Sequence, residues 1–290
     1  MSAMIALFLV LSTLAGCAGE TLVNVKNALP EPAPAVVFLV ETERFEEDVL
    51  DEDGTVLAEC SYELPVLRVL LEDGSALEDA VSSEQEHALA VADVFNARFG
   101  QWKSNGKTLA ESAREDRAFR NEAGLASVSY TDELSCTVYQ TEQLISVSGL
   151  YSTYTGGAHP NSILMSWNFD LETGEFFEPE ILGEGGDLRE YVHLALIKQV
   201  WEVAAEAETM PKDYYWEDYD VILADWSSYA VSFDEAGMTV GFSPYELACY
   251  AAGPQVFYLP YEQLYPHLGQ HGRALLGLEE ESGEPEIVNG

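Results

Sequence analysis

The sequence predicts an α+β fold of two small domains, each with an antiparallel sheet packed against one or two helices. Runs of alternating apolar and polar residues are typical of half-buried strands, and Asp53-Gly54 between two such runs is typical of a hairpin. Two other stretches, 83–100 and 187–207, repeat their apolar residues at helical spacing. The 290 residues are 47% apolar, which is enough for one large core or two modest ones.

The first sixteen residues predict export. An apolar run from Ile5 to Leu14 has the length of the hydrophobic region of a signal peptide and is too short to cross a bilayer as a helix. It ends at Leu14-Ala15-Gly16-Cys17, which resembles the lipobox of bacterial lipoproteins. No Lys or Arg precedes the run, a departure from the usual pattern that leaves the true start codon open. The alternative is a short buried helix.

The lipobox resemblance implies that Cys17 is diacylated and becomes the mature N-terminus. Residues 17–35 are then predicted to form an extended tether, because Pro30, Pro32 and Pro34 alternate with other residues. The expected location is the bacterial cell envelope, with the N-terminal lipid in the membrane. In a Gram-negative cell this is the periplasmic side of the outer membrane.

Residues 36–150 are expected to form the N-terminal domain. Its predicted elements are strands over 35–50, 55–64 and 66–71, helices over 83–100 and 107–120, and strands near 125–130, 134–140 and 144–154. Ser83 and Glu86 are a candidate capping box for the first helix. The basic residues of the second helix are expected to pair with its neighbouring acidic residues, Glu111 and Glu115.

Residues 151–268 are expected to form the C-terminal domain, followed by an acidic flexible tail over 269–290. Its predicted elements are a strand over 163–170 with a partner starting at 176, a helix over 187–207, a hairpin around 234–237 and a final strand into 260–261. The segment 213–219 mixes aromatic residues with carboxylates. Such a segment suits either a loop that receives a cationic partner or a loop folded over the core.

The segment from Thr155 to Asn161, called the glycine corner below, joins two predicted strands and has a specified shape. Gly156 and Gly157 permit positive φ or close backbone approach, while Pro160 biases His159 towards an extended conformation. The candidate ligand-binding residues lie here and in the segments 213–219 and 242–246. They are Gly156, Gly157, His159, Asn161, Tyr215, Trp216 and Tyr245.

His159 supports a catalytic and a structural hypothesis. As a general base it would be oriented by Asp170 or a nearby Glu, since imidazole titrates near neutral pH. No GxSxG serine, Cys–His pair or metal-ligand cluster accompanies it in the sequence, so no catalytic residue is assigned. The structural alternative is a ring that hydrogen-bonds to backbone at a tight corner.

The cysteines predict at most one disulfide. Cys60 and Cys136 both fall at apolar-facing strand positions, and export permits oxidation, whereas the state of Cys249 stays open. No metal or other cofactor is expected, because CxxC and HxxxH spacings are missing. The acidic run before Gly54 does not fit a calcium loop, whose twelfth position would be Cys60.

The charge balance narrows the class of partner. The chain has 51 acidic and 13 basic residues, a formal net charge of -38. Nucleic acid is not expected as a partner, because phosphate binding depends on Lys and Arg. A basic protein would be steered towards such a surface, at rates that fall as salt rises. The alternative is that the acidic surface only keeps the protein soluble in saline surroundings.

Several segments together resemble a known family. They are Tyr154–Pro160, Asp170–Glu175, Phe242–Glu246, Ala251–Gly253 and Leu259–Tyr261. This set is similar to the C-terminal extracytoplasmic domain of the RsiV-type anti-sigma factors. Residues 36–150 are similar to the domain of unknown function that accompanies it there and that also precedes the catalytic domain of PdaC-type peptidoglycan deacetylases.

The resemblance implies an α+β fold and a sensory or binding role at the cell envelope, with lysozyme recognition as the role of the best-understood relatives. The lysozyme contacts are not carried over, because the glycine corner is a signature of the fold and no motif for the contacts is matched. RsiV-type proteins also carry a cytoplasmic sigma-binding segment and a transmembrane helix. This chain has a lipobox instead, so direct anti-sigma activity is not expected.

Three functions stay open at this point. The first is a lipid-anchored binding or sensor module whose partner is a basic protein such as lysozyme, or a peptidoglycan fragment. The second is an envelope hydrolase or a deacetylase-associated enzyme that uses His159. The third is a structural acidic lipoprotein.

Overall fold

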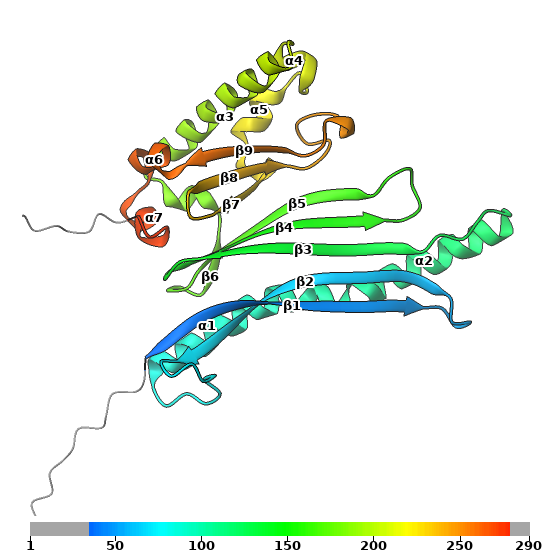
Figure 1. Cartoon of the computed structure of the whole chain (residues 1–290), viewed down its shortest axis with the longest axis horizontal. Coiled ribbons are helices and arrows are strands. Elements are labelled where there is room, and N and C mark those ends of the chain that lie inside the picture. The colour runs from blue at the N-terminus through cyan, green and yellow to red at the C-terminus, as the bar shows by residue number, and fades with distance from the viewer. Residues whose placement is uncertain (1–34, 279–290) are drawn as a thin grey trace, which may run out of the picture. The chain divides into compact units, whose positions relative to one another are not determined.

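The computed structural model describes residues 35–278, so the predicted signal peptide, Cys17 and the tether up to residue 34 lie outside it. The predicted α+β class is confirmed, because a six-stranded sheet and a three-stranded sheet pack with helices (Figure 1). Within the described range, no helix is both long and apolar enough to cross a membrane.

The six strands of the larger sheet follow one another in chain order. They are β1 (Val36–Leu50), β2 (Val56–Leu71), β3 (Tyr130–Gln140), β4 (Leu144–Tyr154), β5 (Asn161–Asp170) and β6 (Glu175–Phe177). Neighbouring strands are antiparallel except β2 and β3, which are parallel. This exception to the expected antiparallel sheet has a topological cause. The chain crosses from β2 to β3 through α1 (Ser83–Gly100), the 3-10 turn η1 (Gln101–Ser104) and α2 (Asn105–Glu122), and a parallel pair requires such a crossover.

The start of α1 differs by one residue from the predicted capping box. Ser82, not Ser83, is the N-cap, and its hydroxyl accepts the Gln85 backbone N–H at 3.3 Å. The Gln85 side chain in turn accepts the Val81 backbone N–H at 2.9 Å. The motif is therefore a capping box with glutamine in place of glutamate, because the amide oxygen supplies the same acceptor.

Two basic residues of α2 pair across the fold and not with Glu111 and Glu115 as predicted, whereas Arg120 does pair with an acidic neighbour on the helix, Asp116, at 2.5 Å. Arg114 lies 3.3 Å from Asp51, and Arg117 contacts both Asp51 and Asp53 in the turn between β1 and β2. The inner side of α2 is made of small residues, so the helix packs close enough to β1 and β2 for the arginines to reach this turn.

The C-terminal part places a long helix over a small antiparallel sheet. The sheet runs β7 (Ala230–Phe233), β8 (Gly237–Phe242) and β9 (Gln255–Pro260). The helices are α3 (Asp187–Glu206), α4 (Pro211–Tyr214), α5 (Tyr219–Ala224), α6 (Tyr261–Leu264) and α7 (Gln270–Leu275), with 3-10 turns η2 (Pro179–Leu182), η3 (Trp226–Ser228), η4 (Tyr250–Ala252) and η5 (Tyr265–His267).

Two hydrophobic cores lie on opposite faces of the larger sheet. One joins α1 to the face that carries Ile145, Val147 and Phe169. The other joins α3 and the small sheet to Leu144, whose side chain leaves β4 on the other face. Figure 1 shows α1 running along β1 and β2, and the small sheet between β5 and α3.

The boundary expected between residues 150 and 151 falls inside β4. This strand pairs with β3 on one side and with β5 on the other, so the sheet is continuous across the expected boundary. The physical reason is that alternate residues of β4 serve both cores. Leu144 belongs to the core with α3, whereas the later core residues up to Leu171 belong to the core with α1, and the core residues from Leu182 on belong to the core with α3.

Residues 269–278 do not form part of a flexible tail as expected. Residues 270–275 form α7, and Leu275 and Leu276 are buried in the core with α3. A Cβ at Gly272 would lie 2.2 Å from the Leu182 carbonyl oxygen, so this helix packs directly on backbone. Residues 279–290 lie outside the described range.

Candidate functional site

The glycine corner forms the loop between β4 and β5, and its backbone conformation favours glycine at position 156. The φ of Gly156 is +92°, a conformation that residues with a Cβ rarely adopt. A Cβ at this position would lie 2.7 Å from Nη2 of Arg120, at the flexible end of that side chain. Gly157 has an ordinary φ, and its carbonyl accepts the Tyr154 hydroxyl at 3.1 Å. The loop therefore has one fixed shape, as the sequence predicted.

His159 is exposed and stacks on Tyr250. The two rings are 3.7 Å apart between centroids and tilted by 19°. His159 Nδ1 lies 2.8 Å from the Pro160 carbonyl, and the Tyr250 hydroxyl donates to the same carbonyl at 3.1 Å. The imidazole therefore bonds to backbone at the corner, as its structural alternative predicted.

The dyad of His159 with Asp170 does not form. Asp170 ends β5, a strand of ten residues and hence about 30 Å long, whereas His159 precedes the start of that strand. The Asp170 carboxylate is buried, and it accepts the backbone N–H groups of Glu172 at 2.8 Å and Thr173 at 3.3 Å. Its role is to close the turn towards β6.

Tyr245 lies beside Tyr250, and Trp216 is hydrogen-bonded to the backbone of Tyr245. The Tyr245 ring lies 5.4 Å from the Tyr250 ring, and Trp216 Nε1 donates to the Tyr245 carbonyl at 2.9 Å. Tyr245 and Trp216 are 56% and 38% exposed. The four side chains His159, Tyr250, Tyr245 and Trp216 are called the aromatic surface below.

Tyr245 is held in a strained backbone conformation. Its φ is +75°, which costs a residue other than glycine on the order of 1–3 kcal/mol. The segment is fixed by the Glu246 side chain, which accepts the Ser243 backbone N–H, and by the Trp216 backbone N–H, which donates to the Leu247 carbonyl at 3.0 Å. Strain that the surroundings maintain is concentrated at binding sites, which marks this turn as a functional candidate.

The other predicted site residues have supporting positions. Tyr215 is 3% exposed and belongs to the core with α3, where burial, together with Tyr214, raises its pKa to about 12. Asn161 is exposed at the start of β5 and pairs with Thr153 across the sheet. Tyr250 was missed in the sequence, although it directly precedes the Ala251–Gly253 segment, because an isolated tyrosine in a loop gives no periodic pattern.

Carboxylates surround the Trp216 side of the aromatic surface. The segment that carries Trp216 and its neighbours also contain one basic residue, Lys212, and four exposed acidic residues: Asp213, Glu217, Asp218 and Asp220. In the described part of the chain, no group of three or more His, Cys, Asp or Glu residues could hold a metal ion. The arrangement offers aromatic faces and negative charge, which suits contact with a cationic group.

The expected disulfide between Cys60 and Cys136 is absent. Both are free thiols, as is the exposed Cys249. In the parallel register, Cys60 pairs with Asp132, so Cys136 lies four residues, or roughly 13 Å, further along β3. A disulfide needs Cα atoms within about 7 Å. Burial, and to a lesser extent Glu63, also raises the pKa of Cys136 to about 12.

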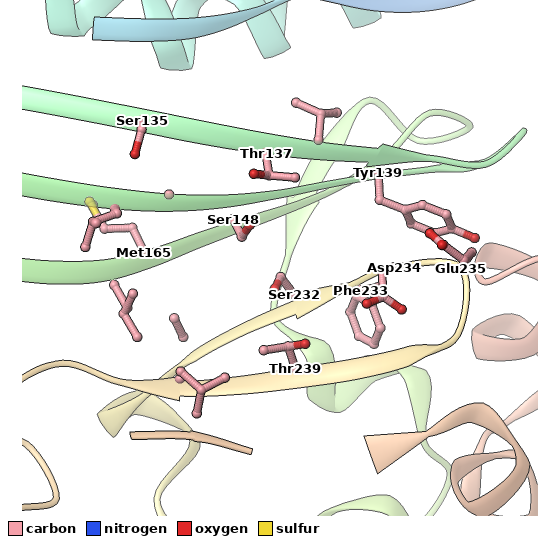
Figure 2. A pocket seen from close by; sticks show the side chains of 17 residues that line it. Ser135, Thr137, Tyr139, Ser148, Met165, Ser232, Phe233, Asp234, Glu235 and Thr239 are labelled. Carbon is pink, nitrogen blue, oxygen red and sulfur yellow. The ribbon is translucent and has the colours of Figure 1, made fainter. Parts of the chain in front are cut away.

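A cleft between the two sheets is a second candidate site that sequence reasoning missed. It has a volume of about 410 Å³ and lies between β3–β5 and the small sheet. Figure 2 shows hydroxyl-bearing side chains entering it from both walls. These are Ser135, Thr137 and Ser148 from the larger sheet and Ser232 and Thr239 from the small one. The sequence shows each as one polar residue in an alternating strand, and only the packing of the sheets brings them together.

One family model matches part of the chain. Residues 189–262, which run from α3 to α6 and include Trp216, Tyr245 and Tyr250, match the model described as "Protein of unknown function (DUF3298)". No curated protein matches the sequence.

Two solved structures are similar to this one. A member of the DUF3298 family from Bacteroides fragilis has a TM-score of 0.57 at 18% identity, over 85% of this chain and 98% of that one. A DUF3298 family protein from Pseudomonas aeruginosa has a TM-score of 0.44 at 14% identity, over 80% of this chain and 95% of that one. The chain therefore contains a DUF3298 domain, at residues 189–262, within an α+β fold that it shares with the Bacteroides fragilis protein.

Proposed function

We propose that this protein is a lipid-anchored binding module of the bacterial cell envelope, and that it captures a basic protein through the aromatic surface. The observation that carries the proposal is the convergence of three chain segments at that surface. His159 comes from the glycine corner, Trp216 from the aromatic-acidic segment, and Tyr245 and Tyr250 from the β8–β9 connection.

Charge supports a basic partner. A net charge of -38 steers a cationic protein towards the surface. The exposed aromatic rings then supply the short-range contacts that make binding tight and specific. Tyrosine and tryptophan are enriched among the residues that dominate binding energies, and Lys or Arg side chains stack favourably on their rings. The resemblance to RsiV-type sensors is part of this proposal, and for that reason lysozyme is the first basic protein to test.

The enzyme hypothesis has less support. His159 lies far from Asp170, the carboxylate that was expected to orient it as a general base, and one face of its ring is covered by Tyr250. The purely structural hypothesis explains the acidic surface but gives no reason for a strained, exposed Tyr245.

Calorimetric titration with hen lysozyme tests the proposal. The titration uses the full chain with Cys17→Ser, at about 50 and about 300 mM salt, between which screening increases strongly. We expect binding that weakens with salt, and a further loss of about tenfold in Tyr245→Gly and Trp216→Ala. Tyr245→Gly is the sharper variant, because glycine tolerates the positive φ and the folded state should lose no stability.

Phe119→Ala is the matched control. Phe119 is an exposed aromatic residue on α2 that makes no contact with the aromatic surface, so its removal should leave the affinity unchanged. Absence of binding at low salt would contradict the proposal. Equal binding of lysozyme and cytochrome c, unaffected by Tyr245→Gly, would show attraction by charge alone and would equally contradict it.

A further inference from the structure

Most of the hydrogen bonds between the two sheets involve one strand, β7, and a further one joins β5 to the end of β8, where the Ser243 hydroxyl accepts the Leu164 backbone N–H at 3.1 Å. One edge of β7 pairs with β8, and the backbone groups on its other edge bond to side chains of the larger sheet and not to the backbone of a further strand. Ser166 accepts the Val231 backbone N–H at 2.9 Å, Ser146 accepts the Phe233 backbone N–H at 2.8 Å, and Asn168 donates to the Val231 carbonyl at 2.9 Å. On this part of the sheet the polar side chains are therefore used to hold the fold.

The cleft opens beside this junction. At its narrow end Gly241 lies against Leu164, and a Cβ on Gly241 would be 2.8 Å from Leu164 Cδ1. Further along, both facing walls carry small side chains, so that a volume of about 410 Å³ stays unfilled. This volume lies in the range of small-molecule sites, about 300–1,000 Å³.

Five hydroxyl groups in the cleft have no hydrogen-bond partner within the described part of the chain. They belong to Ser135, Thr137, Ser148, Ser232 and Thr239. Ser146 and Ser166 lie on the same face of the larger sheet but differ from these five residues, because their hydroxyls accept hydrogen bonds from the backbone of β7. Each free hydroxyl can both donate and accept, so the two walls offer a set of groups matched to a ligand that is rich in hydroxyls.

The remaining lining sets the charge and shape of the ligand. Leu150, Leu164 and Val256 offer apolar surface for C–H groups. Asp234 and Glu235 close one end, and these carboxylates, after burial, raise the pKa of the nearby Tyr139. No Lys, Arg or His lines the cleft, which disfavours phosphates and carboxylates.

We propose that the inter-sheet cleft binds a small saccharide that carries a free amine. Its hydroxyls bond to the two walls, its C–H faces contact the apolar patches, and its ammonium group lies at the acidic end formed by Asp234 and Glu235. This site is separate from the aromatic surface, so it does not depend on the function proposed above.

Ligand titration followed by NMR chemical shifts tests the site. The probes are glucosamine, N-acetylglucosamine and glucosamine 6-phosphate, added to the full chain with Cys17→Ser. We expect saturable shifts for residues of β3, β4, β7 and β8 with glucosamine, and binding about tenfold weaker when the amine is acetylated or a phosphate is present. The proposal would be overturned if none of the three sugars showed saturable binding, or if glucosamine 6-phosphate bound more tightly than glucosamine.

Variants separate the hydroxyls from the acidic end. Thr137→Val with Thr239→Val keeps the shape of the walls and removes two hydroxyls, so it should weaken all binding about tenfold. Glu235→Gln should abolish the preference for glucosamine over its acetylated form. Unchanged affinities in both variants would contradict the site.

Two controls keep this test apart from that of the proposed function. Thr153→Val makes the same substitution on β4 outside the cleft and should change nothing. Tyr245→Gly removes an essential part of the aromatic surface and should leave saccharide binding intact. A loss of saccharide binding in either control would contradict the cleft as the site.

Discussion

Arg117 shows how a single charged residue ties a helix to a turn. Its guanidinium contacts Asp51 and Asp53 and also lies 3.2 Å from the Thr55 hydroxyl, which ties α2 to the β1–β2 turn. The hydrogen bond from Arg117, with further bonds from Thr55, holds the pKa of Asp53 well below its usual range. The ionised carboxylate is thus favoured in the folded state.

The pH dependence of stability should therefore include this contact. A depressed folded-state pKa contributes stability above the unfolded-state pKa of 3.8, and this contribution is lost as pH falls through the lower folded-state value. We expect the free energy of unfolding of the wild type to fall between about pH 5 and about pH 2 more steeply than that of Arg117→Met. Urea unfolding at several pH values measures both slopes.

Lys198→Met is the control for that comparison. Lys198 pairs with Glu202 four residues on in the same helix, at 3.6 Å and largely in solvent, so its loss should leave the pH slope unchanged. An Arg117→Met slope equal to that of the wild type would show that the turn is held by other contacts.

At the scale of elements, β7 is an edge strand whose outer groups bond to side chains. Ser146, Ser166 and Asn168 replace the backbone of a neighbouring strand, and Asn168 is 3% exposed. An unpaired edge is a site for unwanted strand pairing, and these bonds cover it. They also leave β8 and β9 free to diverge from the larger sheet, which creates the cleft.

Asn168→Leu should break this junction. The substitution leaves the buried Val231 carbonyl and the Ser146 hydroxyl without the amide that they contact, at a cost of about 1–3 kcal/mol in the free energy of unfolding. We also expect faster hydrogen exchange at the Val231 and Phe233 amides than in the wild type, with the Val240 amide in β8 less affected. Hydrogen exchange followed by NMR measures both.

Asn161→Leu is the same change at the exposed start of β5 and should alter stability by less than about 0.5 kcal/mol. Protection of Val231 and Phe233 that survives in Asn168→Leu would mean that the side-chain bonds do not hold β7. The control separates this outcome from a general effect of leucine on the strand.

At the scale of the whole molecule, the sequence predicted the α+β class and the two cores, because each core has its own helix with apolar residues at helical spacing. The sequence misplaced the boundary between the two domains. The alternation along β4 predicts that Leu144 and Ile145 lie on opposite faces of the sheet, but it does not show that each face packs into a different core. The aromatic surface was predicted in part from His159, Trp216 and Tyr245. The cleft was not, because its hydroxyls meet only when two sheets from distant parts of the chain face each other.

The proposed anchor is also a property of the whole molecule. If Cys17 is acylated, cells grown with a clickable palmitate analogue should yield labelled protein in the membrane fraction. Cys17→Ser should remove both the label and the membrane association, while Cys249→Ser, a change at an exposed thiol, should keep them. Membrane association of unlabelled Cys17→Ser protein would contradict lipid anchoring.

The parallel pairing of β2 with β3 determines when the larger sheet can be completed. Ala58 meets Tyr130 in this register, so the nascent β1–β2 hairpin keeps an open edge until the whole α1–α2 crossover has been synthesised and folded back. Closing so long a connection is slow compared with forming a hairpin. During that interval a folding chain presents the open edge of β2 to other copies, and the strongly negative charge of the chain keeps those copies apart.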